Sequence, residues 1–154
     1  MSIQKDIYNI QLKWATRVVA LAKANLIRGK KIATGRLYSS VNFSITPKAK
    51  VTFTYAEEGK WVERGRPRGA KMPPPDVIKE WGSIKKLPQF RDKKGRYISN
   101  DSRAFLIARS ISKKGIKPFP WITSAMKQAT QQLKPKQSIA DAVRKGLRSM
   151  LKPT

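Results

Sequence analysis

The sequence has no cysteine and no histidine, and these two absences exclude several kinds of chemistry. Without cysteine the chain cannot form disulfides, and without either residue it lacks the thiolate and imidazole ligands of zinc sites. Catalysis by Ser-His-Asp or Cys-His arrangements is excluded for the same reason, and neither common glycine-rich phosphate-binding string occurs. We therefore expect no catalytic residue, no cofactor and no metal site, in a protein that is not an enzyme.

Long apolar runs are also lacking. The longest run near the N-terminus, residues 18–22, is far shorter than the roughly 18 residues that a membrane span needs. It is also too short for the apolar part of a signal peptide. We expect a soluble, intracellular protein that does not contact a membrane.

Acidic residues are scarce: nine Asp and Glu face 34 Lys and Arg, which gives a net charge of +25 at pH 7. Five of the nine acids fall between Glu57 and Glu80, and the chain after Trp81 holds 18 basic residues against three acids. Charge of one sign repels itself in an isolated protein, whereas contact with phosphates releases counterions and adds affinity. The imbalance predicts a polyanionic partner, bound through its backbone and not through its base sequence.

The apolar pattern of the first 29 residues predicts a long helix. Apolar side chains from Ile3 to Leu21 recur every three or four residues, which places them in one stripe of a helix. Gly29 is a typical residue at a helix C-terminus. We expect a single domain over residues 1–154 that begins with a helix over 1–29.

The period then changes to two, which predicts antiparallel strands over residues 36–64. Apolar and polar residues alternate from Leu37 to Ile45 and again from Val51 to Tyr55, with Pro47 between them. This pattern indicates a hairpin, and Trp61-Val62 is expected to begin a third strand.

Residues 65–100 are rich in proline, glycine and basic residues, which predicts exposed loops with one short helix from Pro75 through Trp81 that Gly82 could end. Residues 101–152 predict helices capped by Asp101 or Ser102, entered at Trp121, and capped by Ser138. The resulting class is α+β, with a small antiparallel sheet packed against the long N-terminal helix and several C-terminal helices.

Two groups of residues are candidates for contact with partners. The basic side chains after Trp81 are the candidates for facing DNA or another polyanion, although a charged outer face is also usual for any solvated helix. The acidic stretch, its basic neighbours and three apolar residues are the candidates for a subunit interface. The first group is Lys93, Lys94, Arg96, Arg103, Arg109, Lys113, Lys114, Arg144, Lys145, Arg148 and Lys152, and the second is Glu57, Glu58, Trp61, Glu63, Arg64, Arg66, Arg68, Asp76, Glu80, Trp81 and Leu106.

The acidic stretch allows a second interpretation, a Mg²⁺-dependent nuclease, because carboxylates are the ligands that Mg²⁺ prefers. Pro75-Asp76 and Glu58-Gly59-Lys60 resemble pieces of a restriction-type nuclease signature, but here they stand in reverse order. The alternative is that these acids pair with nearby Lys and Arg or with another subunit. We favour the pairing interpretation. The large aromatic residues Trp61 and Trp81 are equally compatible with an interface and with the core.

A series of short motifs runs through residues 34–129 in a characteristic order. The pieces are Thr34-Gly35-Arg36-Leu37 with the four residues after it, Tyr55-Ala56, Val62-Glu63-Arg64-Gly65, Pro74-Pro75 with Ile78-Lys79-Glu80-Trp81, residues 104–111, Gly115-Ile116, and Pro118-Phe119-Pro120-Trp121-Ile122 with Ala125. Together they resemble the neck or tail-completion family of long-tailed, siphovirus-type bacteriophages. The chain departs from the family at Arg64-Gly65-Arg66, where Gly-Thr is usual, and in its heavier basic charge.

The resemblance implies a non-enzymatic virion protein that forms a homo-oligomeric ring at the head-to-tail junction. It implies that genomic double-stranded DNA passes through the ring, that portal or adaptor and tail proteins flank it, and that assembly takes place in the host cytoplasm. It also implies an α+β subunit in which Pro118-Phe119-Pro120 leads a helix back onto the sheet. The alternative hypothesis is a monomeric basic nucleic-acid-binding protein, such as a ribosome-associated or DNA-packaging protein.

Overall fold

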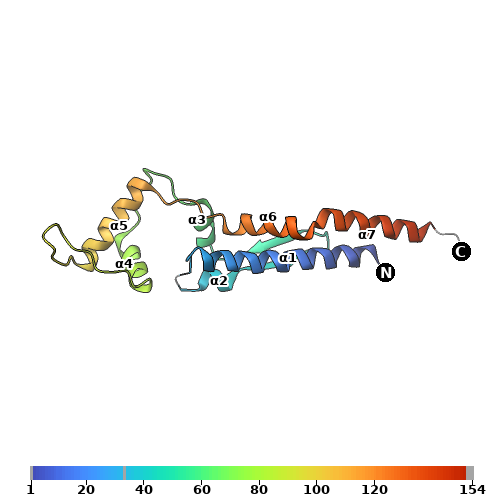
Figure 1. Cartoon of the computed structure of the whole chain (residues 1–154), viewed down its shortest axis with the longest axis horizontal. Helices are drawn as coiled ribbons and strands as arrows, with labels where there is room; N and C mark the ends of the chain where they lie inside the picture. The colour runs from blue at the N-terminus through green and yellow to red at the C-terminus, as the bar shows by residue number, and fades with distance from the viewer. Residues whose placement is uncertain (1, 33, 152–154) are drawn as a thin grey trace.

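The computed structural model describes residues 2–32 and 34–151, and it shows an elongated α+β molecule (Figure 1). One end carries two helices and a long loop, and the other end carries both termini. The sheet is a single antiparallel pair, so the predicted class is confirmed. In chain order the elements are α1 (Ile3–Arg28), α2 (Arg36–Ser40), β1 (Asn42–Ile45), β2 (Val51–Thr54), α3 (Glu58–Arg64), α4 (Pro75–Ile84), α5 (Asn100–Lys114), α6 (Trp121–Leu133) and α7 (Pro135–Met150).

Helix α1 is the longest helix, and the long N-terminal helix predicted from the sequence is confirmed. It ends at Gly29, whose N–H donates to the Asn25 carbonyl at 2.9 Å. Its 26 residues make it about 39 Å long. Both α6 and α7 pack along it. The resemblance implied that the helix after Pro120 packs onto the sheet; the main neighbour of α6 is instead α1.

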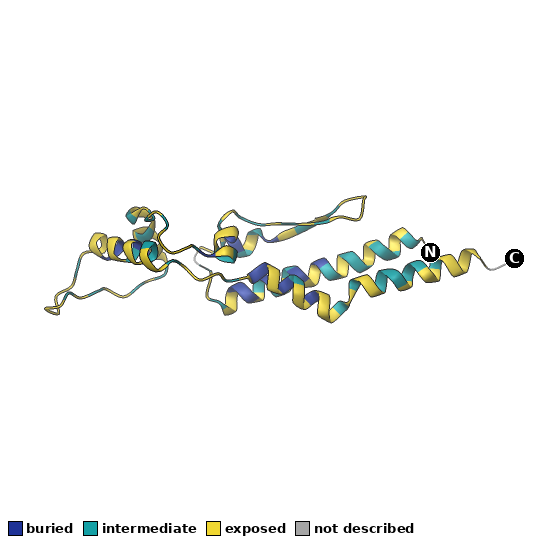
Figure 2. Ribbon diagram, turned by 90° about the horizontal axis from the view of Figure 1, so that it is seen from above, coloured by how far each residue is buried: buried dark blue, intermediate teal, exposed yellow. Residues whose placement is uncertain are grey.

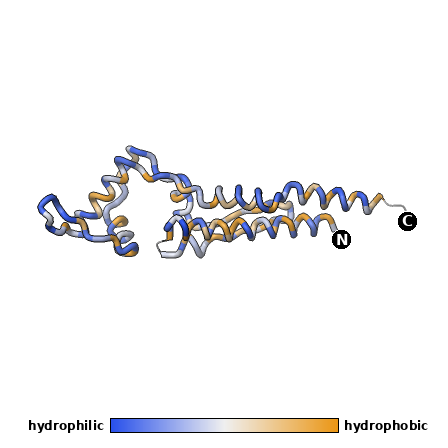
Figure 3. The backbone as a smooth tube through the Cα atoms, viewed as in Figure 1, coloured by the Kyte–Doolittle hydropathy of each residue, from blue (hydrophilic) through white to orange (hydrophobic). Residues whose placement is uncertain are grey.

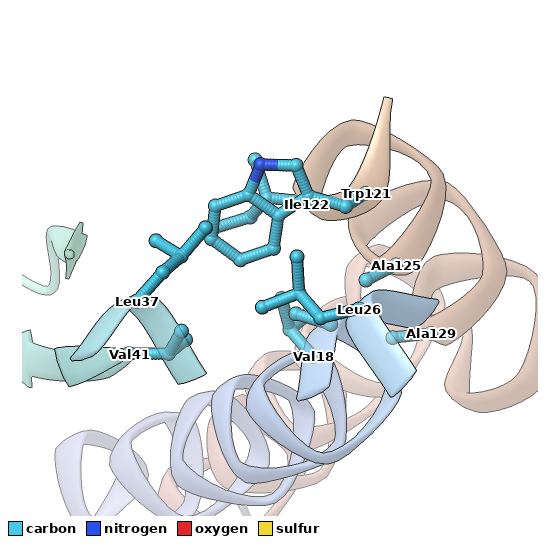
Figure 4. Close-up of a cluster of buried hydrophobic side chains, with 9 residues drawn as sticks. Val18, Leu26, Leu37, Val41, Trp121, Ile122, Ala125 and Ala129 are labelled. Carbon is cyan, nitrogen blue, oxygen red and sulfur yellow. The ribbon is translucent and has the colours of Figure 1, made fainter. Parts of the chain in front are cut away.

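The core lies where α1, α2 and α6 meet (Figure 4). Val18, Leu26 and Trp121 are fully buried. The indole Nε1 of Trp121 donates to the Gly59 carbonyl at 3.0 Å, which satisfies the only polar atom of that ring. Small side chains such as Ala125 let α6 approach α1 closely. Figure 2 shows that the buried residues concentrate in this middle region and become sparse along α7 and the long loop.

The sheet is shorter than the predicted strands over residues 36–64. β1 pairs with β2 so that Phe43 lies opposite Phe53, and Trp14 of α1 meets Phe53 edge to face at 5.7 Å. The alternation before Asn42 does not form a strand. Gly35 takes a left-handed conformation (φ +83°) and starts the short helix α2, which buries Leu37 and the following Val41, four residues apart, in the core.

The predicted third strand at Trp61-Val62 is also wrong, because both residues belong to helix α3. The helical period turns Gly59 and Val62 inward and leaves Trp61 outside. A Cβ at Gly59 would lie 2.5 Å from the Tyr55 ring, so only glycine allows this close approach. The approach brings the Gly59 carbonyl within reach of the Trp121 indole.

Helices α4 and α5 pack on each other and form a lobe, the α4–α5 lobe, which contacts the segment after α1 through Lys85, whose Nζ donates to the Lys30 carbonyl at 3.0 Å. The segments that follow α3 and α5 join this lobe to the rest of the molecule. They pair in an antiparallel bridge, in which Arg66 and Ile116 exchange N–H···O bonds of 2.9 Å. Gly65 and Gly115 flank the bridge with positive φ, and a side chain at either would strike the opposite backbone. Glycine is therefore required at this connection.

Three predicted helix boundaries are corrected. α4 continues past Gly82 to Ile84, because Gly82 lies against the Arg103 side chain of α5 and the packing maintains the helix. The cap of α5 is Ser99, whose hydroxyl accepts from the Ser102 N–H at 3.1 Å, and not Asp101 or Ser102. α7 begins at Pro135, since proline is tolerated in a first turn, and not after Ser138.

Candidate polyanion-binding and subunit surfaces

One exposed basic segment is the loop between α4 and α5, residues 87–99, which we call the basic finger. It projects from the α4–α5 lobe at the end of the molecule opposite the termini (Figure 1), and its tip is strongly hydrophilic (Figure 3). Lys93 and Lys94 at the tip are exposed, and neither forms an ion pair within the described chain. Their ammonium groups are therefore available to an external anion.

Asp92 holds the finger in shape. Its Oδ1 accepts from the backbone N–H groups of Lys94 (2.8 Å) and Arg96 (2.9 Å), and its Oδ2 accepts from the Arg96 guanidinium (2.9 Å). These bonds, led by the one from the Arg96 N–H, keep the pKa of the Asp92 carboxyl below its usual value. Asp92 also pairs with the Arg96 guanidinium. Arg96, one of the predicted polyanion-facing residues, is therefore committed to the turn.

An aromatic side chain stands among these cations. The Arg91 guanidinium lies 4.2 Å from the centre of the Tyr97 ring and also donates to the Tyr97 hydroxyl at 2.5 Å. Tyr97 is nevertheless 62% exposed. The hairpin-like pairing of Arg91 with Tyr97 places this ring among the cations of the basic finger.

The other predicted polyanion-facing residues do not form one surface. Arg103 is buried, and its Nη1 donates to the carbonyls of Leu87 (2.9 Å) and Pro88 (3.0 Å), so the prediction that it faces a polyanion is wrong. Its position on α5 faces α4, where the carbonyls at the start of the basic finger need a hydrogen-bond donor. Lys152 lies outside the described residues. The exposed remainder is divided between α5, with Arg109, Lys113 and Lys114, and α7 at the opposite end, with Arg144, Lys145 and Arg148.

The acidic residues of the stretch 57–80 serve different purposes. Glu63 accepts from the Ile122 N–H at 3.1 Å, which places its carboxylate at the positive end of α6. Glu58 lies 3.7 Å from Arg36. Glu57, Asp76 and Glu80 are exposed and form no ion pair with another described residue. Within residues 2–32 and 34–151 no three acids gather as metal ligands would, which gives the nuclease interpretation no support.

The basic neighbours of this stretch have mixed surroundings. Arg64 and Arg68 are exposed. Arg66 belongs to the bridge between the lobes, and its guanidinium donates to the Lys71 carbonyl. Among the described residues, the nearby pairing predicted for these acids is limited to Glu58 with Arg36.

The three predicted apolar interface residues are all exposed in the monomer. Trp61 is 66% exposed, Leu106 46% and Trp81 39%. Val77 and Ile84 on α4 are exposed as well, as are Leu147 and Met150 on α7. Clusters of large apolar side chains in water are a usual sign of contact surfaces. The sequence pattern does not single out those on α7, because their spacing fits a buried helix face.

No helix in the described part of the chain combines the length and apolarity needed to cross a bilayer. Comparisons with protein-family models, with curated proteins and with solved structures found no match to this chain.

Proposed function

We propose that the protein is a structural component of a tailed-bacteriophage virion, present as a homo-oligomeric ring at the head-to-tail junction through which double-stranded DNA passes. One observation carries the proposal: the cationic charge is not neutralised within the molecule. The chain has 34 Lys and Arg, and the described residues form four ion pairs, all with substantial exposure of the basic partner. Such a surface attracts polyanions such as a DNA backbone.

The arrangement of the cations supports binding to a DNA backbone. Lys93 and Lys94 project from a turn whose backbone Asp92 holds, so little backbone entropy is lost when they contact phosphates. The separation of the finger from the body suits a subunit that reaches toward a channel while its body contacts neighbours. Portal or adaptor and tail proteins are the partners that this location implies.

The proposal is tested by locating the chain in virus particles. We expect an antibody against the chain to label the head-to-tail junction, and mass spectrometry of purified virions to detect it in a constant number of copies. Deletion of its gene should leave filled heads and separate tails. Its absence from virions, with normal assembly in the deletion strain, would contradict the proposal.

A second candidate function, a monomeric nucleic-acid-binding protein, is favoured by the Arg91–Tyr97 pair. An exposed aromatic ring among cations can stack on an unpaired base, which a purely channel-lining surface does not need. In this case the purified protein should bind single strands as a monomer, and Tyr97→Ala should weaken that binding about fivefold or more. For a virion ring, Tyr97→Ala should leave duplex binding nearly unchanged.

A further inference from the structure

Two exposed helix faces at opposite ends of the molecule have matching patterns. On α4, Val77 and Trp81 form an apolar row four residues apart, and Asp76 and Glu80 form an acidic row beside it. We call this face, with Ile84, the acidic stripe of α4. Residues at i and i+4 lie on one side of a helix, so each row is continuous.

The second face lies near the end of α7. Leu147 and Leu151 form an apolar row at the same spacing, and the exposed Arg144 and Arg148 form a basic row beside it, in which Arg144 also pairs with Asp141 of its own helix at 3.4 Å. We call this face the basic stripe of α7. The acidic stripe covers the ten residues of α4, about 15 Å, and residues 144–151 cover about 12 Å, so the two have similar lengths.

The structure explains why the basic stripe has no cover within its own chain. Gly146 packs directly on Ile3, in the first turn of α1. α7 therefore runs past the N-terminal end of α1, as Figure 1 shows, and Leu147, Met150 and Leu151 are 51%, 73% and 80% exposed. Within the described chain, these apolar side chains have no helix to pack against.

We propose that the acidic stripe of α4 in one copy binds the basic stripe of α7 in a second copy, an inference that rests on the proposed ring. Packed side by side, the two helices bring apolar row against apolar row and place Asp76 and Glu80 next to Arg144 and Arg148. A cavity of about 210 Å³ beside Trp81, lined also by Ile32 and Val62, leaves room for a leucine or methionine side chain.

A contact between unlike stripes of two copies is more favourable than a contact between two like stripes. Two acidic stripes would repel each other, and so would two basic stripes, whereas unlike stripes attract. Because the stripes lie at opposite ends of the subunit, a bound pair of copies leaves one stripe of each kind open. Such a contact is heterologous, and it produces a ring when its rotation closes.

The absence of native cysteine allows a direct test by disulfide cross-linking. Val77→Cys and Leu147→Cys place one thiol on each stripe. After mild oxidation, each variant alone should remain unlinked, a mixture of the two should give a covalent dimer, and the double variant should give a ladder of larger species. Thr123→Cys, on the exposed side of α6, replaces Val77→Cys in the matched control and should not link to Leu147→Cys.

Charge reversal adds a specific readout. Asp76→Lys with Glu80→Lys should lower the yield of the mixed dimer about tenfold, and Arg144→Glu with Arg148→Glu in the other copy should restore it. The size of the assembly, measured with and without duplex DNA, separates the proposed α4–α7 interface from the proposed ring. Assembly without the α4–α7 link, or a link between two copies of Val77→Cys, overturns this interface but leaves the ring. A monomer under every condition overturns both.

Discussion

At the scale of single residues, burial and not residue type decides what a charged side chain does. Arg103 and Arg109 stand six positions apart on α5, yet the first is buried and bonded to two carbonyls while the second is exposed. The helical pattern could not separate them, because the carbonyls of Leu87 and Pro88 come from a loop whose course the sequence does not specify. Asp92 was likewise counted only as one of the acids, although it organises the basic finger.

Arg103→Ala should therefore destabilise the protein, whereas Arg109→Ala should not. Removal of the Arg103 side chain leaves two carbonyls without a donor and opens a cavity, at a combined cost of about 2–4 kcal/mol. Arg109→Ala, the matched control, should change the free energy of unfolding by about 0.5 kcal/mol or less. Urea denaturation followed by circular dichroism measures both. Equal effects of the two substitutions would contradict the buried role of Arg103.

Acid should loosen the basic finger through Asp92. Because the folded state lowers the pKa of this carboxyl, its contribution is present above the ordinary value near 3.8 and is lost as the pH falls through the folded pKa. The amide resonances of Lys94 and Arg96 should shift together below about pH 4, while those of α6 stay in place. Asp92→Ala, which removes both acceptor oxygens, should give the loosened state at neutral pH. A finger that keeps its amide shifts in Asp92→Ala would argue against this role.

At the scale of elements, the sequence predicts the long amphipathic helices well and the short segments poorly. The helix stripe of α1 and the end at Gly29 were correct because many residues and a clear terminator agree. The spacing of four between Leu37 and Val41 fits either a strand or a helix, and the left-handed Gly35 with the burial of both side chains decides for a helix. The separation of the α4–α5 lobe depends on the long-range bridge at Arg66, which no local pattern signals.

The contact between α7 and α1 should depend on Gly146. Gly146→Leu gains about 1 kcal/mol of helix propensity but forces a side chain into Ile3, and such overpacking costs about 1–3 kcal/mol. We expect a net loss of stability and faster hydrogen exchange in the second half of α7. Gln137→Leu, on an exposed position of the same helix, is the control and should leave exchange unchanged. Equal exchange in both variants would show that Gly146 is not needed for the close contact.

At the scale of the whole molecule, shape and charge belong together. A rounded protein with this charge would concentrate its repulsion, whereas the elongated form places the basic finger and the basic stripe of α7 at opposite ends. If α7 binds a neighbouring copy, its arginines meet carboxylates, and the finger with the exposed end of α5 is left for DNA. The exposed polyanion-facing candidates of the described chain are thereby divided between two partners.

This division predicts how DNA binding responds to salt. Contact with about six phosphates should lower duplex affinity roughly a thousandfold between 50 and 200 mM salt. Loss of two contacts in Lys93→Ala with Lys94→Ala should reduce the slope of log affinity against log salt by about two, because each phosphate contact contributes about 0.9. Lys127→Ala on α6 should change it little. Fluorescence anisotropy across a salt series measures all three proteins; a finger variant with the wild-type slope would place the DNA elsewhere, on α5 or α7.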